Sequence, residues 1–216
     1  MSFLAQPFGV LLKLIYDLIG NYGLSIIVFT IVTKLLLVPL TMKQMKSMKQ
    51  MQEIQPKLKE LQEKYKNDKE KLNIKTMELY KEQNVSPFGG CLPLLIQFPI
   101  IIGLFAVLRE PVLYGIAAEA IDVPFLWLPS LLTPDKSLVL PILAAITTYL
   151  SSATMSQNQT DQTQKMMTYM FPVLIFWWGR SFPAGLTLYW VVSNAFQVVQ
   201  QLVIVKPYAK LKEGSN

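Results

Sequence analysis

Lys34 is the residue whose type and position point most directly to chemistry. It is the only charged residue in the apolar run LSIIVFTIVTKLLLVPL, which covers residues 24–40. A charge near the centre of a membrane-spanning helix costs at least about 2.5–3.5 kcal/mol, so it usually faces a wet cavity and serves a function. The plainer alternative is that the lysine stem carries the amine to the nearby end of the run, at the membrane surface.

The other apolar runs supply polar but neutral groups. They cover residues 91–108, 138–152, 166–178 and 186–205, and none of the five runs contains Asp or Glu. Lys34 therefore has no acidic partner in them, and a lone cation among neutral groups is suited to attract an acidic group from outside the protein. Each Ser or Thr taken alone is more simply a contact between packed helices. The polar residues that we group with Lys34 are Thr30, Gln97, Thr147, Thr148, Ser151, Ser152, Asn194 and Gln197.

A second feature is the segment MKQMKSMKQMQ, which follows the first run. Met42, Met45, Met48 and Met51 alternate there with lysines. A three-residue step on a helix gives a broad, slanting stripe, and flexible methionines suit surfaces that accept varied apolar partners. The stripe could receive a substrate, or it could dip into the membrane interface beside lysines that attract anionic lipids. The sequence leaves both open.

The residue types that are missing exclude several kinds of active site. The chain has no His and one Cys, which excludes a Ser-His-Asp triad, most zinc sites and an internal disulfide. We therefore expect no enzymatic activity, no metal and no cofactor. Ion-coupled transporters normally need carboxylates in their spans. A small polytopic transporter or channel is therefore only the alternative function, beside a structural subunit of a larger complex.

The composition indicates the fold that must hold these residues. Hydrophobic residues make up 52% of the chain and charged residues only 16%, which is typical of a membrane protein. Apolar runs of this length predict transmembrane helices, so we expect an all-α polytopic membrane protein with five transmembrane helices. Residues 1–21 carry apolar residues at helical spacing, which predicts an amphipathic helix lying on the membrane surface.

The distribution of Lys and Arg predicts the orientation. Eleven of the 20 basic residues lie within residues 42–90, and with five spans 15 fall on one side, which places the N-terminus outside and the C-terminus in the cytoplasm. Charges of both signs alternate between residues 42 and 88, which favours a solvated helical hairpin over a direct nucleic-acid partner. The predicted segments are an extracytoplasmic helix (1–21), a first span (22–41), a cytoplasmic helical hairpin that breaks near Asn67 and Asp68 (42–88), four further spans (89–205) and a short cytoplasmic tail (206–216).

Three stretches resemble the hallmark segments of YidC-type membrane protein insertases. They are TIVTKLLLVPLTMKQMKSM, NVSPFGGCLPLLIQFPIIIGLFAVLRE and FPAGLTLYWVVSNAFQVVQQ, in the family's order and spacing. The resemblance implies a five-span core around a hydrophilic groove that is open to the cytoplasm and to lipid but closed to the outside. It also implies a location in the bacterial plasma membrane.

The resemblance assigns roles residue by residue. Lys34 stands where the family usually has a groove arginine, which keeps the charge but loses the bidentate fork. Thr30 matches the polar position one turn earlier, Gln97 the second-span glutamine, and Trp190 an aromatic position that contacts substrate. Ser151 stands where some relatives carry glutamine, and Asn194 completes the predicted groove.

The function implied by this resemblance is insertion of membrane proteins without covalent chemistry. Polar extracytoplasmic segments would cross through the groove while apolar segments leave into the bilayer, alone or beside the Sec channel. The implied partners are nascent membrane proteins, the lipid bilayer, the ribosome and the Sec translocon. In this scheme Met42, Met45, Met48 and Met51 capture the substrate first.

Overall fold

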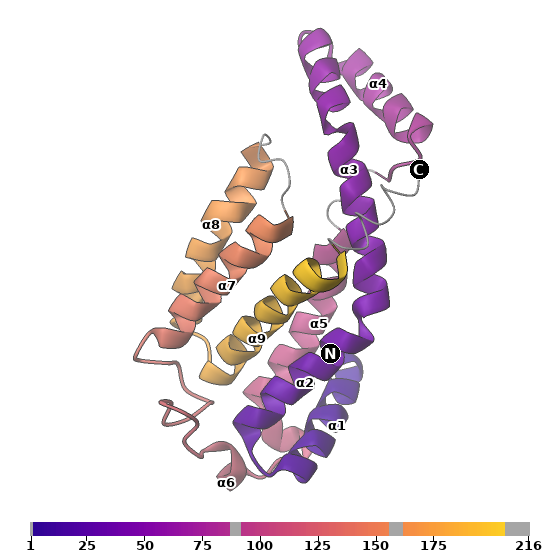
Figure 1. The fold of residues 1–216 in the computed structure, drawn as a ribbon. Helices are drawn as coiled ribbons and strands as arrows, with labels where there is room; N and C mark the ends of the chain where they lie inside the picture. The colour runs from indigo at the N-terminus through magenta and orange to yellow at the C-terminus, as the bar shows by residue number, and fades with distance from the viewer. Residues whose placement is uncertain (1, 87–91, 156–161, 206–216) are drawn as a thin grey trace. The chain divides into compact units, whose positions relative to one another are not determined.

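The structure, a computed structural model, describes residues 2–86, 92–155 and 162–205. These residues are mostly helical, and the extended pairing among them is a single bridge between Phe125 and Leu128. The chain divides into two compact units, one formed by residues 1–36 with 99–216 and the other by residues 37–98. The helices are α1 (Ser2–Ile19), α2 (Tyr22–Leu36), α3 (Val38–Lys64), α4 (Lys69–Glu82), α5 (Leu92–Arg109), α6 (Ala118–Ile121), α7 (Val139–Met155), α8 (Gln162–Gly179) and α9 (Ala184–Gln200), with a 3-10 turn η1 (Pro111–Tyr114) and a π-helical turn η2 (Gln201–Val205) (Figure 1).

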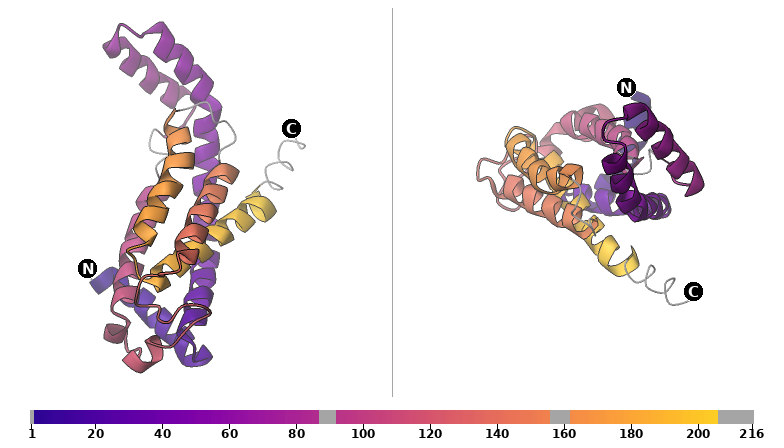
Figure 2. Two further views of the ribbon diagram at one scale, coloured as in Figure 1. Left: turned by 90° about the vertical axis from the view of Figure 1, so that its left-hand side faces the viewer. Right: turned by 90° about the horizontal axis from the view of Figure 1, so that it is seen from above.

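The larger unit is a helical bundle with one continuous apolar core. Helix α9 lies between α2 and α7, while α8 packs on α7 and α1 packs on α2 (Figures 1 and 2). The core joins buried side chains from α1, α2, α5, α9 and the segment before α7, including Leu12, Phe29, Leu104, Leu131 and Leu188. The bundle is therefore stabilised chiefly by burial of aliphatic and aromatic side chains.

The start of α9 is fixed against the segment that precedes α7. Backbone N–H groups of Ala184 and Gly185 donate to the carbonyls of Thr133 and Leu131 at 2.9 and 2.8 Å. A Cβ on Gly185 would lie 3.2 Å from Ile26 Cδ1, so the missing side chain permits the close approach of α9 to α2. These contacts fix the position of α9 along α2, and these two helices carry most of the predicted site.

The break between α2 and α3 falls inside the predicted first span, residues 22–41. Helix α2 ends at Leu36 and α3 begins at Val38, with Pro39 in its first turn. A proline is accepted in a first turn because the N–H that it lacks has no partner there in any case. Among the described residues no single helix is both long and apolar enough to cross a membrane, and α2 with α3 meets that test only as an interrupted pair. The number of spans stays a prediction.

The smaller unit contains a helical hairpin made of α3 and α4. Its core is formed by Ile54 and Leu58 from α3 with Leu79 and Val85 from the second half. The connection lies at residues 65–68, where the sequence predicted a break near Asn67 and Asp68. Asp68 caps α4 by accepting a hydrogen bond from the backbone N–H of Lys71 at 3.0 Å, which satisfies one of the free donors at a helix start.

Helix α1, within the predicted segment 1–21, is amphipathic, and its location on the outer membrane surface stays a prediction. Ala5, Leu12 and Ile15 are buried against the larger unit's core. Val10, Leu14 and Leu18 form an exposed apolar stripe, and beside it Lys13 pairs with Asp17 one turn later. The outward side of α1 therefore has an apolar strip and a charged strip, a division that suits a helix lying at a membrane surface.

Candidate functional site

Lys34 lies on the inward face of α2. The buried residues of this helix include Ile26, Phe29, Thr30, Thr33 and Lys34, at the spacing of one helix face. The opposite face carries the exposed apolar side chains of Leu24, Val28, Ile31 and Leu35. The side chain of Lys34 is therefore directed into the protein and not toward the surroundings of α2.

The Lys34 amine is buried without compensation from neighbouring carboxylates. The residue is only 8% exposed, and among the described residues it has no hydrogen-bond acceptor and no ion-pair partner. Its position in the last turn of α2 gives one favourable interaction, because the helix dipole presents partial negative charge there. A buried cation that depends on a helix dipole alone is a strong attractor for an incoming anionic group.

The hydroxyls nearest in sequence do not solvate Lys34. Thr30 is completely buried, and its Oγ1 donates to the carbonyl of Ile26 at 2.6 Å. Thr33 Oγ1 donates in the same way to the carbonyl of Phe29 at 2.8 Å. Each hydroxyl donates its hydrogen bond to a carbonyl of its own helix, so the lone pairs of its oxygen stay available as acceptors.

Helices α7 and α9 are joined by a polar cluster that we call the Thr148 cluster, formed by Thr148, Trp190 and Asn194. Trp190 Nε1 donates to Thr148 Oγ1 at 3.0 Å, and Asn194 Nδ2 donates to the same oxygen at 2.9 Å. Thr148 Oγ1 in turn donates to the carbonyl of Ala144 at 2.6 Å. Trp190 and Asn194 are four residues apart, so they lie on one face of α9 and can reach a single acceptor.

The polar contact between α7 and α9 continues one turn beyond this cluster. Ser151, three residues after Thr148, is buried, and its carbonyl accepts from Thr154 Oγ1 at 2.9 Å. Gln201 Nε2 donates to the carbonyl of Thr154 at 3.5 Å, while its buried Oε1 has no partner among the described residues. The contact of α7 with α9 and η2 therefore includes both paired and unpaired hydrogen-bonding groups. A buried acceptor without a partner is costly unless a polar group or water reaches it.

The predicted site residues fall on three packed helices of one unit. Thr30 and Lys34 come from α2, Trp190 and Asn194 from α9, which packs on α2, and Ser151 from α7, which packs on α9. The side chain of Gln97 lies outside the part of the chain that is described. Besides Lys34, Asp135 is the charged residue of the described chain that is more than nine-tenths buried. Its carboxylate accepts a hydrogen bond from the Leu140 N–H at the start of α7.

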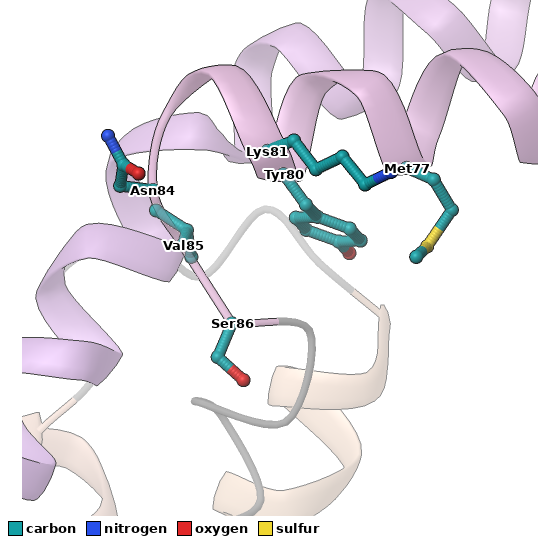
Figure 3. A pocket seen from close by; sticks show the side chains of 6 residues that line it. All are labelled: Met77, Tyr80, Lys81, Asn84, Val85 and Ser86. Carbon is teal, nitrogen blue, oxygen red and sulfur yellow. The ribbon is translucent and has the colours of Figure 1, made fainter.

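The four candidate capture methionines lie on α3 in the other unit. Met42, Met45, Met48 and Met51 are all partly buried, and Met51 packs against the hairpin core. The hairpin also has an open pocket of about 370 Å³ that sequence reasoning did not single out (Figure 3). Its lining mixes apolar and polar side chains, namely Met77, Tyr80, Lys81, Asn84, Val85 and Ser86.

Thr148 is the main residue whose role could not be read from the sequence. It stands in the pair Thr147–Thr148, and either threonine could have turned toward α9. In the structure, Thr147 Oγ1 bonds only to the carbonyls of Leu143 and Ala144 within its own helix. The sequence signal for this role was the four-residue spacing of Trp190 and Asn194. Two donors on one helix face predict an acceptor on the facing helix, but they do not identify which residue supplies it.

Comparison with known proteins places this geometry in a class of helical inner membrane proteins. Residues 14–212 match the sequence profile of the family described as 60Kd inner membrane protein. A membrane protein insertase YidC from Caldanaerobacter subterraneus subsp. tengcongensis is 43% identical over 215 residues, covering 100% of both chains. A membrane protein insertase YidC from Fusobacterium nucleatum subsp. nucleatum is 43% identical over 205 residues, covering 95% of this chain and 96% of that one.

A solved structure agrees with these sequence relationships. The crystal structure of an active YidC insertase, with its first transmembrane domain resolved, superposes with a TM-score of 0.69 at 28% identity. The match covers 94% of this chain and 46% of that chain, so this chain spans about half the length of that protein. The chain belongs to the 60Kd inner membrane protein family, the family that the three hallmark stretches resembled, and the bacterial plasma membrane is its location.

Proposed function

We propose that this chain is a membrane protein insertase in which Lys34 receives a polar or acidic segment of the substrate. The observation that carries the proposal is a buried lysine on the inward face of α2 that has no carboxylate partner among the described residues. The relatives that are 43% identical over nearly the whole chain are named membrane protein insertases. A small transporter or channel is the weaker alternative, because no carboxylate accompanies Lys34 in the apolar runs.

The mechanism is the lowering of a desolvation barrier. A polar segment that crosses hydrocarbon loses its hydration, and each unsatisfied group costs several kcal/mol. A hydrated groove beside Lys34 and Thr30 would replace part of that hydration and shorten the apolar path that remains. The cation favours acidic segments most, since its attraction acts in a region of low dielectric.

The α7–α9 seam supplies the neutral side of this groove. Thr148 holds the Trp190 indole and the Asn194 amide in fixed orientations, which presents an aromatic face and polar edges to a passing chain. Ser151 and Gln201 add hydrogen-bonding groups along the same seam. The outward faces of α7 and α8 expose apolar side chains along which the substrate's own apolar segment would leave into lipid, among them Ile142, Ile146, Leu150, Val173 and Trp177.

The hairpin would make the first contact with the substrate. Its methionines are partly exposed and flexible, and the exposed Lys43 and Lys46 lie between them. In this arrangement five helical spans place α3 and α4 in the cytoplasm and α1 outside, following the distribution of Lys and Arg. Nascent membrane proteins are then the substrates, with the ribosome and the Sec translocon as partners in delivery.

The proposal is tested by changing the charge at position 34 and following insertion into proteoliposomes. The substrate is a single-spanning protein whose translocated tail is acidic, and a matched substrate has a neutral tail. We expect Lys34→Ala to abolish insertion of the acidic substrate, Lys34→Arg to retain it, and the neutral substrate to be affected less. Wild-type insertion of the acidic substrate by Lys34→Ala would disprove the role of the charge.

Two further measurements separate the alternatives. An ion or solute flux through proteoliposomes that requires Lys34, without insertion, would favour a channel or transporter. Crosslinks from position 34 or 190 to a stalled nascent chain are expected for an insertase, whereas a purely structural subunit would give none.

A further inference from the structure

A two-residue turn with an apolar tip connects two buried positions in the segment before α7. Phe125 and Leu128 exchange two backbone hydrogen bonds, each 2.9 Å long, which close a tight turn around Leu126 and Trp127. Phe125 and Leu128 are 8% and 2% exposed, whereas Leu126 and Trp127 are 71% and 45% exposed. The two end residues of the turn are therefore buried, and its two central residues present a large apolar surface at the tip.

The residue type at this tip contradicts the usual chemistry of turns. Leu126 has a φ of +56°, a conformation that bulky residues rarely adopt and that Gly or Asn accepts far more readily. Tight turns are normally built from small or polar residues. Leu126 is both strained and exposed, and strained residues of this kind cluster at functional sites.

The turn is held rigidly on the bundle. The ring of Phe125 occupies the space above Gly23 on α2, where an added Cβ would overlap the ring. Pro124 and Pro129 flank the turn on either side and restrict the backbone before the contact is made. A fixed tip of this kind can insert into a neighbouring phase without a further loss of conformational entropy.

We propose that Leu126 and Trp127 form a membrane-interface anchor that fixes how deeply this end of the bundle sits in the lipid. Tryptophan rings favour the boundary between headgroups and acyl chains. The side chain of Trp127 is hydrogen-bonded to the Asp135 carboxylate, so its ring can lie at that boundary without an unpaired donor. In the sequence, the exposed charges of Asp122 and Lys136 stand on either side of the tip, a pattern that suits apolar residues lying beneath charged headgroups. Membership of an inner membrane protein family supplies the bilayer, and calling this leaflet the outer one rests on the topology proposed above.

Two other apolar surfaces lie at the same end of the bundle. Helix α1 packs against η1, whose Val112 and Leu113 are exposed, and the segment from η1 through α6 to α7 lies at this end in both side views (Figures 1 and 2). The exposed stripe of Val10, Leu14 and Leu18 belongs to the same α1 helix. The anchor would thus act together with an amphipathic helix at a single interface.

The proposal is tested with site-specific probes on the whole protein. In a Cys91→Ser background, which has no other cysteine, an environment-sensitive fluorophore is attached at Leu126→Cys, Trp127→Cys or Lys136→Cys. The proteins are reconstituted in phosphatidylcholine–phosphatidylglycerol vesicles. Quenching is measured with aqueous iodide and with lipids spin-labelled near the headgroup. We expect labels at 126 and 127 to be quenched by the lipid and shielded from iodide several-fold more than the label at 136.

A second variant separates anchoring from folding. Leu126→Asn relieves the backbone conformation but removes the apolar side chain, so it should preserve or raise the unfolding temperature. It should also reduce lipid quenching of a label at 127. Unchanged lipid quenching in Leu126→Asn, or equal iodide access at 126 and 136, would overturn the anchor. Shielding at 126 in cell membranes but not in pure lipid vesicles would assign the tip to a protein partner and would also overturn it.

Discussion

The indole Nε1 of Trp190 donates to Thr148 Oγ1 at 3.0 Å, across 42 residues of sequence. This bond fixes the orientation of an aromatic side chain at the seam between α9 and α7. Asn194 shares the same acceptor, so one hydroxyl oxygen determines the positions of two candidate substrate-contacting residues. Thr148 therefore acts as a positioning residue, and its removal should affect Trp190 and Asn194 together.

Thr148→Val keeps the shape of the side chain but removes the shared acceptor. We expect the free energy of unfolding in detergent to fall by about 1–2 kcal/mol, because two partly buried donors lose their partner. Insertion of the substrate into proteoliposomes should also become weaker. Thr147→Val is the matched control, since Thr147 bonds only within its own helix. Equal effects of the two variants would show that Thr148 does not position Trp190.

Asp135 should make the start of α7 sensitive to acid. It is buried against solvent, yet hydrogen bonds from the Ser137 hydroxyl, from the Leu140 and Ser137 N–H groups and from the Trp127 side chain outweigh that burial and lower the pKa of the Asp135 carboxyl. A lowered folded-state pKa gives stability that is complete above the ordinary value of about 4 and is lost as pH falls through the lower folded value.

Asp135→Ala should therefore lower the free energy of unfolding by about 1–2 kcal/mol at neutral pH. The difference between this variant and wild type should shrink below about pH 4. Chemical unfolding followed over a pH series measures it, with Asp122→Ala at an exposed position as the control. A difference that stays constant down to the lowest pH would mean that the carboxylate charge is not involved.

Gly23→Ala should disturb the seat of Phe125 on α2. An added Cβ would overlap the Phe125 ring, so the turn must shift, and we expect a loss of about 1–3 kcal/mol of folding free energy. Gly179→Ala is the control because its Cβ would find its nearest neighbour, on Pro141, at 3.5 Å. Thermal unfolding of both variants in the same detergent gives the comparison, and similar unfolding temperatures would contradict the close packing of Phe125.

The hairpin should open locally when its helix cap is removed. The pKa of Asp68 is lowered by the backbone N–H and the ammonium of Lys71, so the cap is charged at neutral pH. In Asp68→Ala, amide hydrogen exchange should accelerate several-fold in the first turn of α4 and remain unchanged in α7. Glu78→Gln, which breaks only the exposed pair with Lys75, should leave exchange in that first turn nearly unchanged because exposed ion pairs contribute little.

Much of the helical layout was predictable from the periodicity of apolar residues and from the residues that start or end helices. The apolar spacing in residues 1–21 predicted α1, and the Asn67–Asp68 pair predicted the start of α4, because both signals act within one or two helical turns. The interruption at Leu37 was harder to predict. Pro39 is compatible with a continuous kinked span or with a new helix, so its position in the sequence does not decide between them.

The sequence by itself determined which chemistry is present: one lysine in an apolar run, no carboxylate in any such run, and a Trp-Asn pair spaced to share one helix face. It could not name the acceptor for that pair, nor show that Leu126 and Trp127 project from a strained turn. Those outcomes depend on contacts between residues far apart in the chain, and helical periodicity encodes the face of a residue but not its partner. Tertiary packing decided them, because it fixes which faces meet and which backbone conformations are enforced.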